Sequence, residues 1–369
     1  GPDFVVGPTE DYTKRNVKGV IAAVPDYATT VVKVRHAAQM MSQTISGKAI
    51  HPVAGVPGGW SKPLSEDERK GLIETAEDCL SFAKESVAFV KENIFPKYID
   101  AVKSLGVIKT GFLGTVQDDG ALNHYDGKLR LMKADGSYTD FDSKDYTDHI
   151  AEHLEEWSYG KFPYYKNEDG FSMDLEDPKG IYRVGSLARI NVCDKMSTPV
   201  AQAELEEFRK EFGRPAQQPL LYHWSRLIET VYSAERTLEL LNDPEITDKD
   251  TWTPVEPRAA RGVGHVEASR GTLIHDYSTD DQGILTDVNL IVATIHNNGA
   301  LNMSAKAAAQ QLIHADNIDP GIMNQIEMAL RAYDPCMSCA THAIDGGVPT
   351  EIKILSHTGE LLSTFKNFK

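Results

Sequence analysis

The chain has 369 residues, of which 41% are hydrophobic and 25% are charged, and no run of about 18 apolar residues, so the sequence predicts a globular protein without a membrane span. Its formal net charge of −16 argues against a nucleic-acid-binding protein, which would carry a basic stripe. Its four cysteines are too few for a disulfide framework at this length, which favours a reducing, cytoplasmic compartment.

Residues 1–106 are predicted to form a helical unit. The first long helix should run from Pro25 to about Ser46, because proline suits the first turn of a helix and a glycine follows the serine. Ser65 and Glu68 have the spacing of a capping box, which predicts the start of a second helix. The apolar residues of this second helix step by three or four and define one face: Leu72, Ala76, Cys79, Ala83, Val87, Val90 and Ile94.

Residues 107–185 have the pattern of a β-rich insert. The Asp-Gly dipeptides at 119–120, 126–127 and 135–136 predict turns. Between two of them, residues 128–132 alternate between polar and apolar side chains, as a half-buried strand does. We therefore expect hairpins here.

Residues 186–342 are predicted to be a mainly helical core. A segment that contains Gly262, Gly264 and Gly271 is expected to be a loop, and residues 285–294 are either a strand or a buried helix. The helical pattern is clearest in three stretches: 220–241, 303–314 and 320–332. The predicted fold is mainly α with a smaller β-containing part, an α+β class built on a central bundle of long helices.

The segment 334–342, with the sequence Asp-Pro-Cys-Met-Ser-Cys-Ala-Thr-His, places Cys336, Cys339 and His342 at intervals of three residues. Two thiolates at this spacing can face one metal ion, and thiolates favour zinc, iron or nickel over magnesium. A structural zinc site is the alternative. Such a site normally has four ligands, and the sequence offers no second pair of ligands for it.

The same segment resembles the C-terminal signature of the large subunits of NiFe hydrogenases. Residues 267–271, Glu-Ala-Ser-Arg-Gly, resemble the Glu-Ala-Pro-Arg-Gly segment of that family, with serine in place of the usual proline. Further similar segments follow the family's order along the chain: 47–52, 189–196 and 221–229. The similarity is greatest to the cytosolic methyl-viologen-reducing type, which partners heterodisulfide reductase in methanogens.

The resemblance implies a metal role for the C-terminal motif. Cys336 would be a terminal ligand of nickel, and Cys339 a ligand that bridges nickel to an iron carrying carbon monoxide and cyanide. The thiolate of Cys336 would also accept a proton when dihydrogen is split heterolytically. His342 would hold a separate magnesium or iron ion. By itself, such a histidine is more often a capping or surface residue.

The resemblance also implies a layer of residues above the metals. Arg270 and Asp334 would act directly at the centre, and Thr294 would lie near the cyanide ligands. Each has a simpler interpretation: an arginine usually forms a structural ion pair, and an aspartate before proline is common in turns. Cys79 and Cys193 match no ligand of the family and are predicted to be buried structural thiols.

Two departures from the family pattern concern the ends of the chain. The family's other motif, Arg-x-Cys-Gly-x-Cys, supplies two more nickel ligands and is absent here. Three explanations stay open: this chain lacks its N-terminal part, another polypeptide supplies the motif, or the protein has lost the site. Residues 343–369 resemble the extension that a maturation endopeptidase removes after nickel insertion.

The resemblance implies partners as well. Four cysteines cannot hold iron–sulfur clusters in addition to nickel, so electrons should leave through an iron–sulfur small subunit. Further partners would be a heterodisulfide reductase complex and a subunit for electron transfer. Two alternatives remain open. The chain could be a metal-free structural subunit related to one in respiratory complex I, or a zinc-binding interaction module.

Overall fold

The structure is a computed structural model that describes residues 2–11, 13–158, 160–167, 169–314, 319–336, 351–356 and 358–366. Its longer helices are α3 (Pro25–Ser46), α4 (Glu66–Asn93), α5 (Phe95–Ser104), α8 (Pro199–Phe212), α9 (Tyr222–Leu241), α11 (Asn298–Leu312) and α12 (Pro320–Arg331). The shorter helices are α1 (Asp3–Val6), α2 (Val17–Ala23), α6 (Tyr146–His149), α7 (Ser186–Val192) and α10 (Ala293–His296). Three single 3₁₀ turns complete the described helical part: η1 (Ser143–Asp145), η2 (Pro219–Leu221) and η3 (Pro244–Thr247).

The strands form small separate sheets. The largest has the order β5-β4-β3-β8 and the next has the order β11-β10-β9, while the pairs β1-β2, β6-β7 and β12-β13 stand alone. The bounds of the strands are β1 (Gly55–Val56), β2 (Gly59–Trp60), β3 (Gly111–Val116), β4 (Lys128–Met132), β5 (Tyr138–Phe141), β6 (Ile150–His153), β7 (Phe162–Tyr165), β8 (Tyr182–Arg183), β9 (Ala260–Ala268), β10 (Gly271–Thr279), β11 (Leu285–Ile291), β12 (Glu351–Leu355) and β13 (Leu361–Lys366). The predicted α+β class with a helical majority is confirmed.

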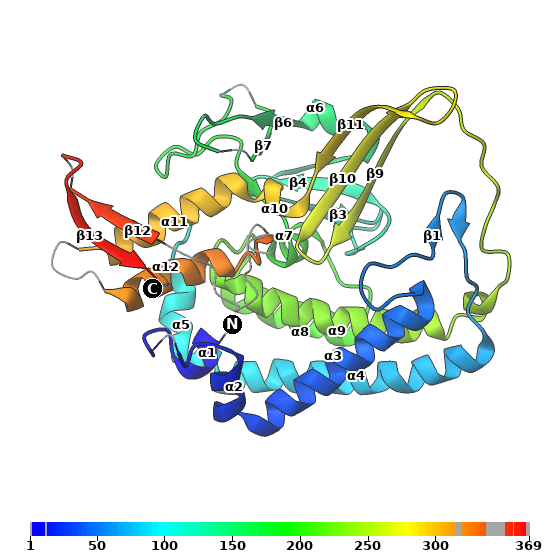
Figure 1. Ribbon diagram of the computed structural model, residues 1–369, viewed down its shortest axis with the longest axis horizontal. Coiled ribbons are helices and arrows are strands. Elements are labelled where there is room, and N and C mark those ends of the chain that lie inside the picture. The colour runs from blue at the N-terminus through cyan, green and yellow to red at the C-terminus, as the bar shows by residue number, and fades with distance from the viewer. Residues whose placement is uncertain are drawn as a thin grey trace.

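The long helices α3, α4 and α9 run along the length of the molecule, with α4 packed against both of the others (Figure 1). Local signals set the ends of α3 and α4 as predicted. Pro25 occupies the first turn of α3, and Gly47 ends this helix in the left-handed conformation, with φ 84°. The capping box of Ser65 and Glu68 starts α4, with both of its reciprocal hydrogen bonds present. Within the described ranges, no helix combines the length and the apolar character needed to cross a bilayer.

The antiparallel sheet β9–β11 lies where a loop was expected, and that prediction is wrong. The strands β9 and β10 pair without interruption from Gly271 opposite Ala268 to Thr279 opposite Ala260. Gly262 and Gly264 lie inside β9, so that the ladder of backbone hydrogen bonds outweighs their weak preference for strands. The ambiguous segment 285–294 becomes the strand β11 followed by the start of α10.

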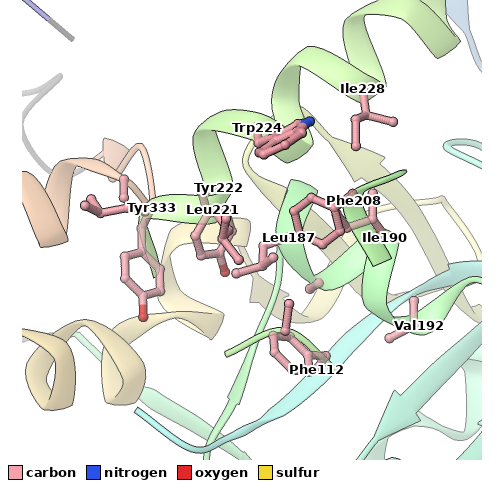
Figure 2. Packing of buried hydrophobic residues seen from close by; sticks show 14 of the residues in the cluster. Phe112, Leu187, Ile190, Val192, Phe208, Leu221, Tyr222, Trp224, Ile228 and Tyr333 are labelled. Carbon is pink, nitrogen blue, oxygen red and sulfur yellow. The ribbon is translucent and has the colours of Figure 1, made fainter. Parts of the chain in front are cut away.

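The main core lies between the four-stranded sheet and the helices. Leu187 and Ile190 of α7 pack between two parts of the molecule (Figure 2). Phe112 of β3 lies on one side of them, and Leu221 with the side chains of α9 lies on the other. Full burial of each such side chain contributes about 1.5–3 kcal/mol of transfer free energy. This core therefore fixes α7 and α9 relative to each other. The predicted strands within 107–185 are present, and the division of the chain into four parts stays a prediction.

Candidate metal centre and its surroundings

Two segments that are far apart in the sequence meet at Arg270 and Asp334. Arg270 lies at the turn between β9 and β10, and Asp334 lies just after α12. The Nε of Arg270 donates a hydrogen bond to the carbonyl oxygen of Asp334 at 2.9 Å and lies 3.1 Å from the carboxylate Oδ2 of the same residue. Both side chains are partly exposed, at 35% and 50%. The structure thus brings together two of the residues that the sequence analysis assigned to one site.

The chain changes direction at Asp334 and then presents Cys336. Asp334 has φ 55°, in the left-handed region, where aspartate is more tolerated than most residues. The backbone N–H of Cys336 donates a hydrogen bond to Oγ1 of Thr294 at 3.1 Å. Cys336 is exposed, and its thiol forms no disulfide. The predicted site residue Thr294 therefore contacts the backbone of the predicted ligand Cys336.

A buried cluster of charges lies behind the Arg270 turn. Arg189 of α7 forms a bidentate ion pair with Glu229 of α9, with both N–O distances 2.6 Å. Its Nη1 also lies 3.0 Å from Oε2 of Glu267, at the end of β9. The other oxygen of Glu267 accepts hydrogen bonds from the hydroxyls of Thr115 and Thr272, at 3.0 and 2.8 Å. Burial would raise the pKa of the Glu229 carboxyl, but the charge and hydrogen bonds of Arg189 lower it to about 2.

The turn that carries Arg270 is held by backbone contacts. Arg189 donates to the carbonyl oxygens of Ala268 and Ser269, at 2.9 and 3.3 Å. Gly185 and Gly271 both have positive φ, at 99° and 138°. A Cβ at Gly185 would lie 2.9 Å from the carbonyl oxygen of Arg270, and a Cβ at Gly271 would lie 2.3 Å from Val184. The backbone of the turn therefore packs closely against Val184 and Gly185, at the start of α7.

A second arginine holds the Asp334 segment. The guanidinium of Arg226, on α9, donates to the carbonyl oxygen of Ala332 and contacts Nδ1 of His223. Burial lowers the pKa of His223 well below its ordinary value, which keeps this imidazole neutral at pH 7. Beside them lies a cavity of about 490 Å³, lined by Asp3, Phe4, His223, Arg226, Met328, Arg331, Asp334 and Pro335. The cavity thus borders the two residues that precede Cys336.

The donor set that the structure describes fits part of a site for a soft metal. Cys336 is exposed and directly follows Pro335, which lines the cavity, and a thiolate is a soft ligand. Cys339 and His342 lie outside the described residues. Within the described ranges, no group of three or more His, Cys, Asp or Glu side chains is arranged to hold a metal ion. The ligand roles of Cys336, Cys339 and His342 therefore stay predictions.

The two other cysteines behave differently from each other. Cys193 is buried as predicted, and burial raises the pKa of its thiol to about 11. Cys79 is only half-buried, so the prediction of a buried thiol is wrong for this residue. It lies on α4 but is not among the buried residues of that helix, which are Leu72, Ala76, Ala83, Ser86 and Val87.

Sequence reasoning missed the buried residues that support the site. Arg189, Arg226 and Glu229 lie within segments that resemble the family, but they received no role. Arg189 and Glu229 are 40 positions apart, a separation that carries no local signal of contact. Only the packing of α7 on α9 brings Arg189 close to Arg226 and Glu229.

Comparison with known proteins gives concordant results. The sequence model of the family described as nickel-dependent hydrogenase matches residues 114–342. The chain is 40% identical, over 374 aligned residues that span all of it, to the iron–sulfur subunit of an F420-non-reducing hydrogenase from Archaeoglobus profundus, and the match covers 77% of that protein. It is 45% identical over 312 residues to a vhu subunit of the F420-non-reducing hydrogenase from Methanococcus voltae, covering 84% of this chain and 72% of that one.

The fold is similar to a solved structure as well. A crystal structure of an NAD⁺-reducing NiFe hydrogenase in the H₂-reduced state matches with a TM-score of 0.85 and 37% identity, over 92% of this chain and 74% of that chain. The range matched by the family model includes Arg270, Asp334 and Cys336.

Proposed function

The chain belongs to the nickel-dependent hydrogenase family, and from this premise we propose that it is the catalytic large subunit of a NiFe hydrogenase. The reaction is the reversible heterolytic cleavage of dihydrogen, with electrons passed to an iron–sulfur partner subunit. One observation supports this proposal most directly. Arg270, Thr294 and the segment that leads to Cys336 come from three separate parts of the chain and meet at one place.

The proposed chemistry divides between the metals and the chain. A bound nickel–iron centre supplies Lewis-acid and redox chemistry toward dihydrogen. Cys336 and Cys339 would hold nickel as thiolates, and the sulfur of Cys336 would take up the proton released from dihydrogen. Arg270 presents fixed hydrogen-bond donors at this place, and the carboxylate of Asp334 limits where its guanidinium points. Thr294 holds the backbone of Cys336 and so orients the thiolate.

The finer assignments belong to the same proposal. The iron would carry carbon monoxide and cyanide, and His342 would hold a magnesium or iron ion. The relatives are named as subunits, which supports a partner in the form of an iron–sulfur small subunit. The further partners, in the cytoplasm, are a heterodisulfide reductase complex, a maturation endopeptidase that cleaves before residues 343–369, and an electron-transfer subunit.

The test is carried out on the complex purified with its natural partners. We expect stoichiometric nickel in the large subunit, infrared bands of carbon monoxide and cyanide that report the iron of the same centre, and hydrogen-dependent reduction of a viologen dye. Cys336→Ser should lose nickel and dye reduction together, because an alcohol is a far weaker ligand for nickel than a thiolate.

The matched control is Cys79→Ser, which changes a half-buried cysteine on α4, away from the site. It should keep the metals and the activity of the wild type. Stoichiometric zinc without nickel in the large subunit would support the interaction module instead, and a large subunit without any metal would support a structural subunit. Either result would overturn the proposal.

A further inference from the structure

One face of α9 contacts both segments of the site through arginine side chains. Arg226 and Glu229 are three residues apart on this helix and therefore point to the same side. Arg226 donates directly to the carbonyl oxygen of Ala332, two residues before Asp334. Glu229 reaches the other segment through Arg189, which in turn donates to the backbone just before Arg270.

We propose that Arg189 and Arg226 are positioning residues, which set the position of Arg270 relative to Asp334 and Cys336. Both are anchored to α9, because Arg226 belongs to this helix and Arg189 is paired with its Glu229. The proposal deepens the proposed function, because it rests on Arg270 and Asp334 acting at the reacting centre. It assigns neither arginine a contact with substrate or metal. Both act through backbone carbonyls of the segments that they hold.

The contact between Arg270 and Asp334 cannot fix the site by itself. Both side chains are partly exposed, and an ion pair in water is weakened by solvent and by side-chain entropy. Arg189, in contrast, is 2% exposed, and its guanidinium donates to a carboxylate in a bidentate geometry. Such pairs are geometrically the most restrictive of protein hydrogen bonds. The rigid element of the site therefore lies behind Arg270.

Arg189 also links the ion pair to the direction of the turn. Its contacts with the carbonyls of Ala268 and Ser269 are possible only while the turn keeps its present path. The hydroxyls of Thr115 and Thr272 satisfy the remaining oxygen of Glu267, so that the cluster has a partner for each of its carboxylate oxygens. A fully satisfied buried network is stiff, and a catalytic group needs a support of this kind to keep its geometry.

The experiment compares two charge-neutralising double variants of the full complex. Arg189→Met with Glu229→Gln removes the proposed positioning pair. The control, Arg130→Met with Asp140→Asn, removes another bidentate pair of a buried arginine, with distances of 2.7 and 2.8 Å. Arg130 also donates to a backbone carbonyl, that of Val192, but it contacts neither the turn of Arg270 nor the segment of Asp334.

The first readout is the rate at which p-hydroxyphenylglyoxal modifies Arg270, followed by peptide mass spectrometry. We expect the Arg189 double variant to raise this rate several-fold, and the Arg130 double variant to leave it unchanged. This readout needs no hydrogen chemistry. Failure of the proposed function, seen as a wild type without nickel or dye reduction, is therefore distinguishable from failure of the positioning role.

The second readout is kinetic. The Arg189 double variant should lower kcat for hydrogen oxidation by about 10- to 100-fold with KM nearly unchanged, because a displacement of about 1 Å has an effect of this size. In an Arg270→Lys background, the same double variant should lower kcat by less than about threefold further, since residues that act through one another are not additive. A merely structural pair would lower kcat by the same factor in both backgrounds.

Single variants keep the test decisive if the double variant does not fold. Arg189→Lys retains the charge, but its three donors cannot serve two carboxylates and two carbonyls at once, so it should also raise the modification rate of Arg270. Arg226→Gln removes the contact with the carbonyl oxygen of Ala332 and so loosens the segment of Asp334. It should also raise the modification rate of Arg270. An unchanged rate in both folded variants would overturn the proposal.

Discussion

The two segments that meet at the candidate site are held in opposite ways. The turn of Arg270 is anchored by the buried pair of Arg189 and Glu229 and by two closely packed glycines. The segment from Ala332 to Cys336 is held by two part-buried hydrogen bonds, from Arg226 to the carbonyl oxygen of Ala332 and from the backbone N–H of Cys336 to the hydroxyl of Thr294. One side is thus fixed by desolvated charge, and the other by single hydrogen bonds to the backbone.

The difference shows where the precision of such a site is located. A contact near the reacting centre must remain open to substrate and metal, so it is exposed to solvent and contributes little to stability. The contacts that restrict its position can lie one layer deeper, where loss of a partner is costly. Cys336 has a place defined by its backbone, while its thiol stays accessible.

The largest expected effect comes from breaking the buried pair alone. Arg189→Met should lower the free energy of unfolding by about 3–5 kcal/mol, because Glu229 and Glu267 are then left with buried, unpaired charges. Arg270→Gln should lower it by about 0–1 kcal/mol, because its ion pair is exposed. Urea-induced unfolding of the purified protein, followed by circular dichroism, measures both.

The double variant of Arg189 and Glu229 is the control for this comparison. It should be more stable than Arg189→Met, since one of the two stranded charges is removed with its partner. Equal losses for Arg189→Met and Arg270→Gln would contradict the contrast between the two segments.

The contrast was only partly accessible from the sequence. The ends of α3 and α4 followed from Pro25 and from the capping box at Ser65, because these signals act within one turn. Strand β4 followed from alternation. The sheet β9–β11 was missed, because its glycines suggest a loop locally, and only pairing with β10 makes β9 a strand.

The site was accessible in a different way. Resemblance placed Arg270, Asp334, Thr294 and Cys336 in one region, and the structure brings the described members into contact. The support behind them was not predicted. Arg189 and Glu267 are separated by 77 other residues, and a buried ion pair between such distant positions has no local signature.

A smaller effect is expected from acid. The pKa of Glu229 lies at about 2 in the folded protein, against an ordinary value of 4.5. Because the folded pKa is depressed, the stabilisation by its charge is complete above about pH 4.5 and is lost as the pH falls toward 2. This loss corresponds to about 3 kcal/mol. Glu229→Gln should therefore be less stable than the wild type at pH 7 and should lose less stability than the wild type between pH 4.5 and 2.

Unfolding curves of both proteins over this pH range measure the difference. The control is Glu239→Gln, which changes an exposed glutamate on the same helix, and it should keep the acid dependence of the wild type. If the stability of Glu229→Gln and of Glu239→Gln depended on pH in the same way, the charge of Glu229 would not stabilise the fold around the Arg270 turn.

The smallest effect concerns Asp334, where backbone and charge can be separated. Asp334→Asn removes the ion pair with Arg270 but suits φ 55°, so stability should change by less than about 1 kcal/mol. Asp334→Ala loses the same charge and also strains the left-handed backbone, which should lower stability by about 1–2 kcal/mol more. In both variants the carbonyl oxygen of residue 334 remains available to Nε of Arg270. Thermal unfolding at pH 7 ranks the variants, and equal stabilities for Asn and Ala would show that the backbone conformation at this position contributes nothing to holding the Cys336 segment.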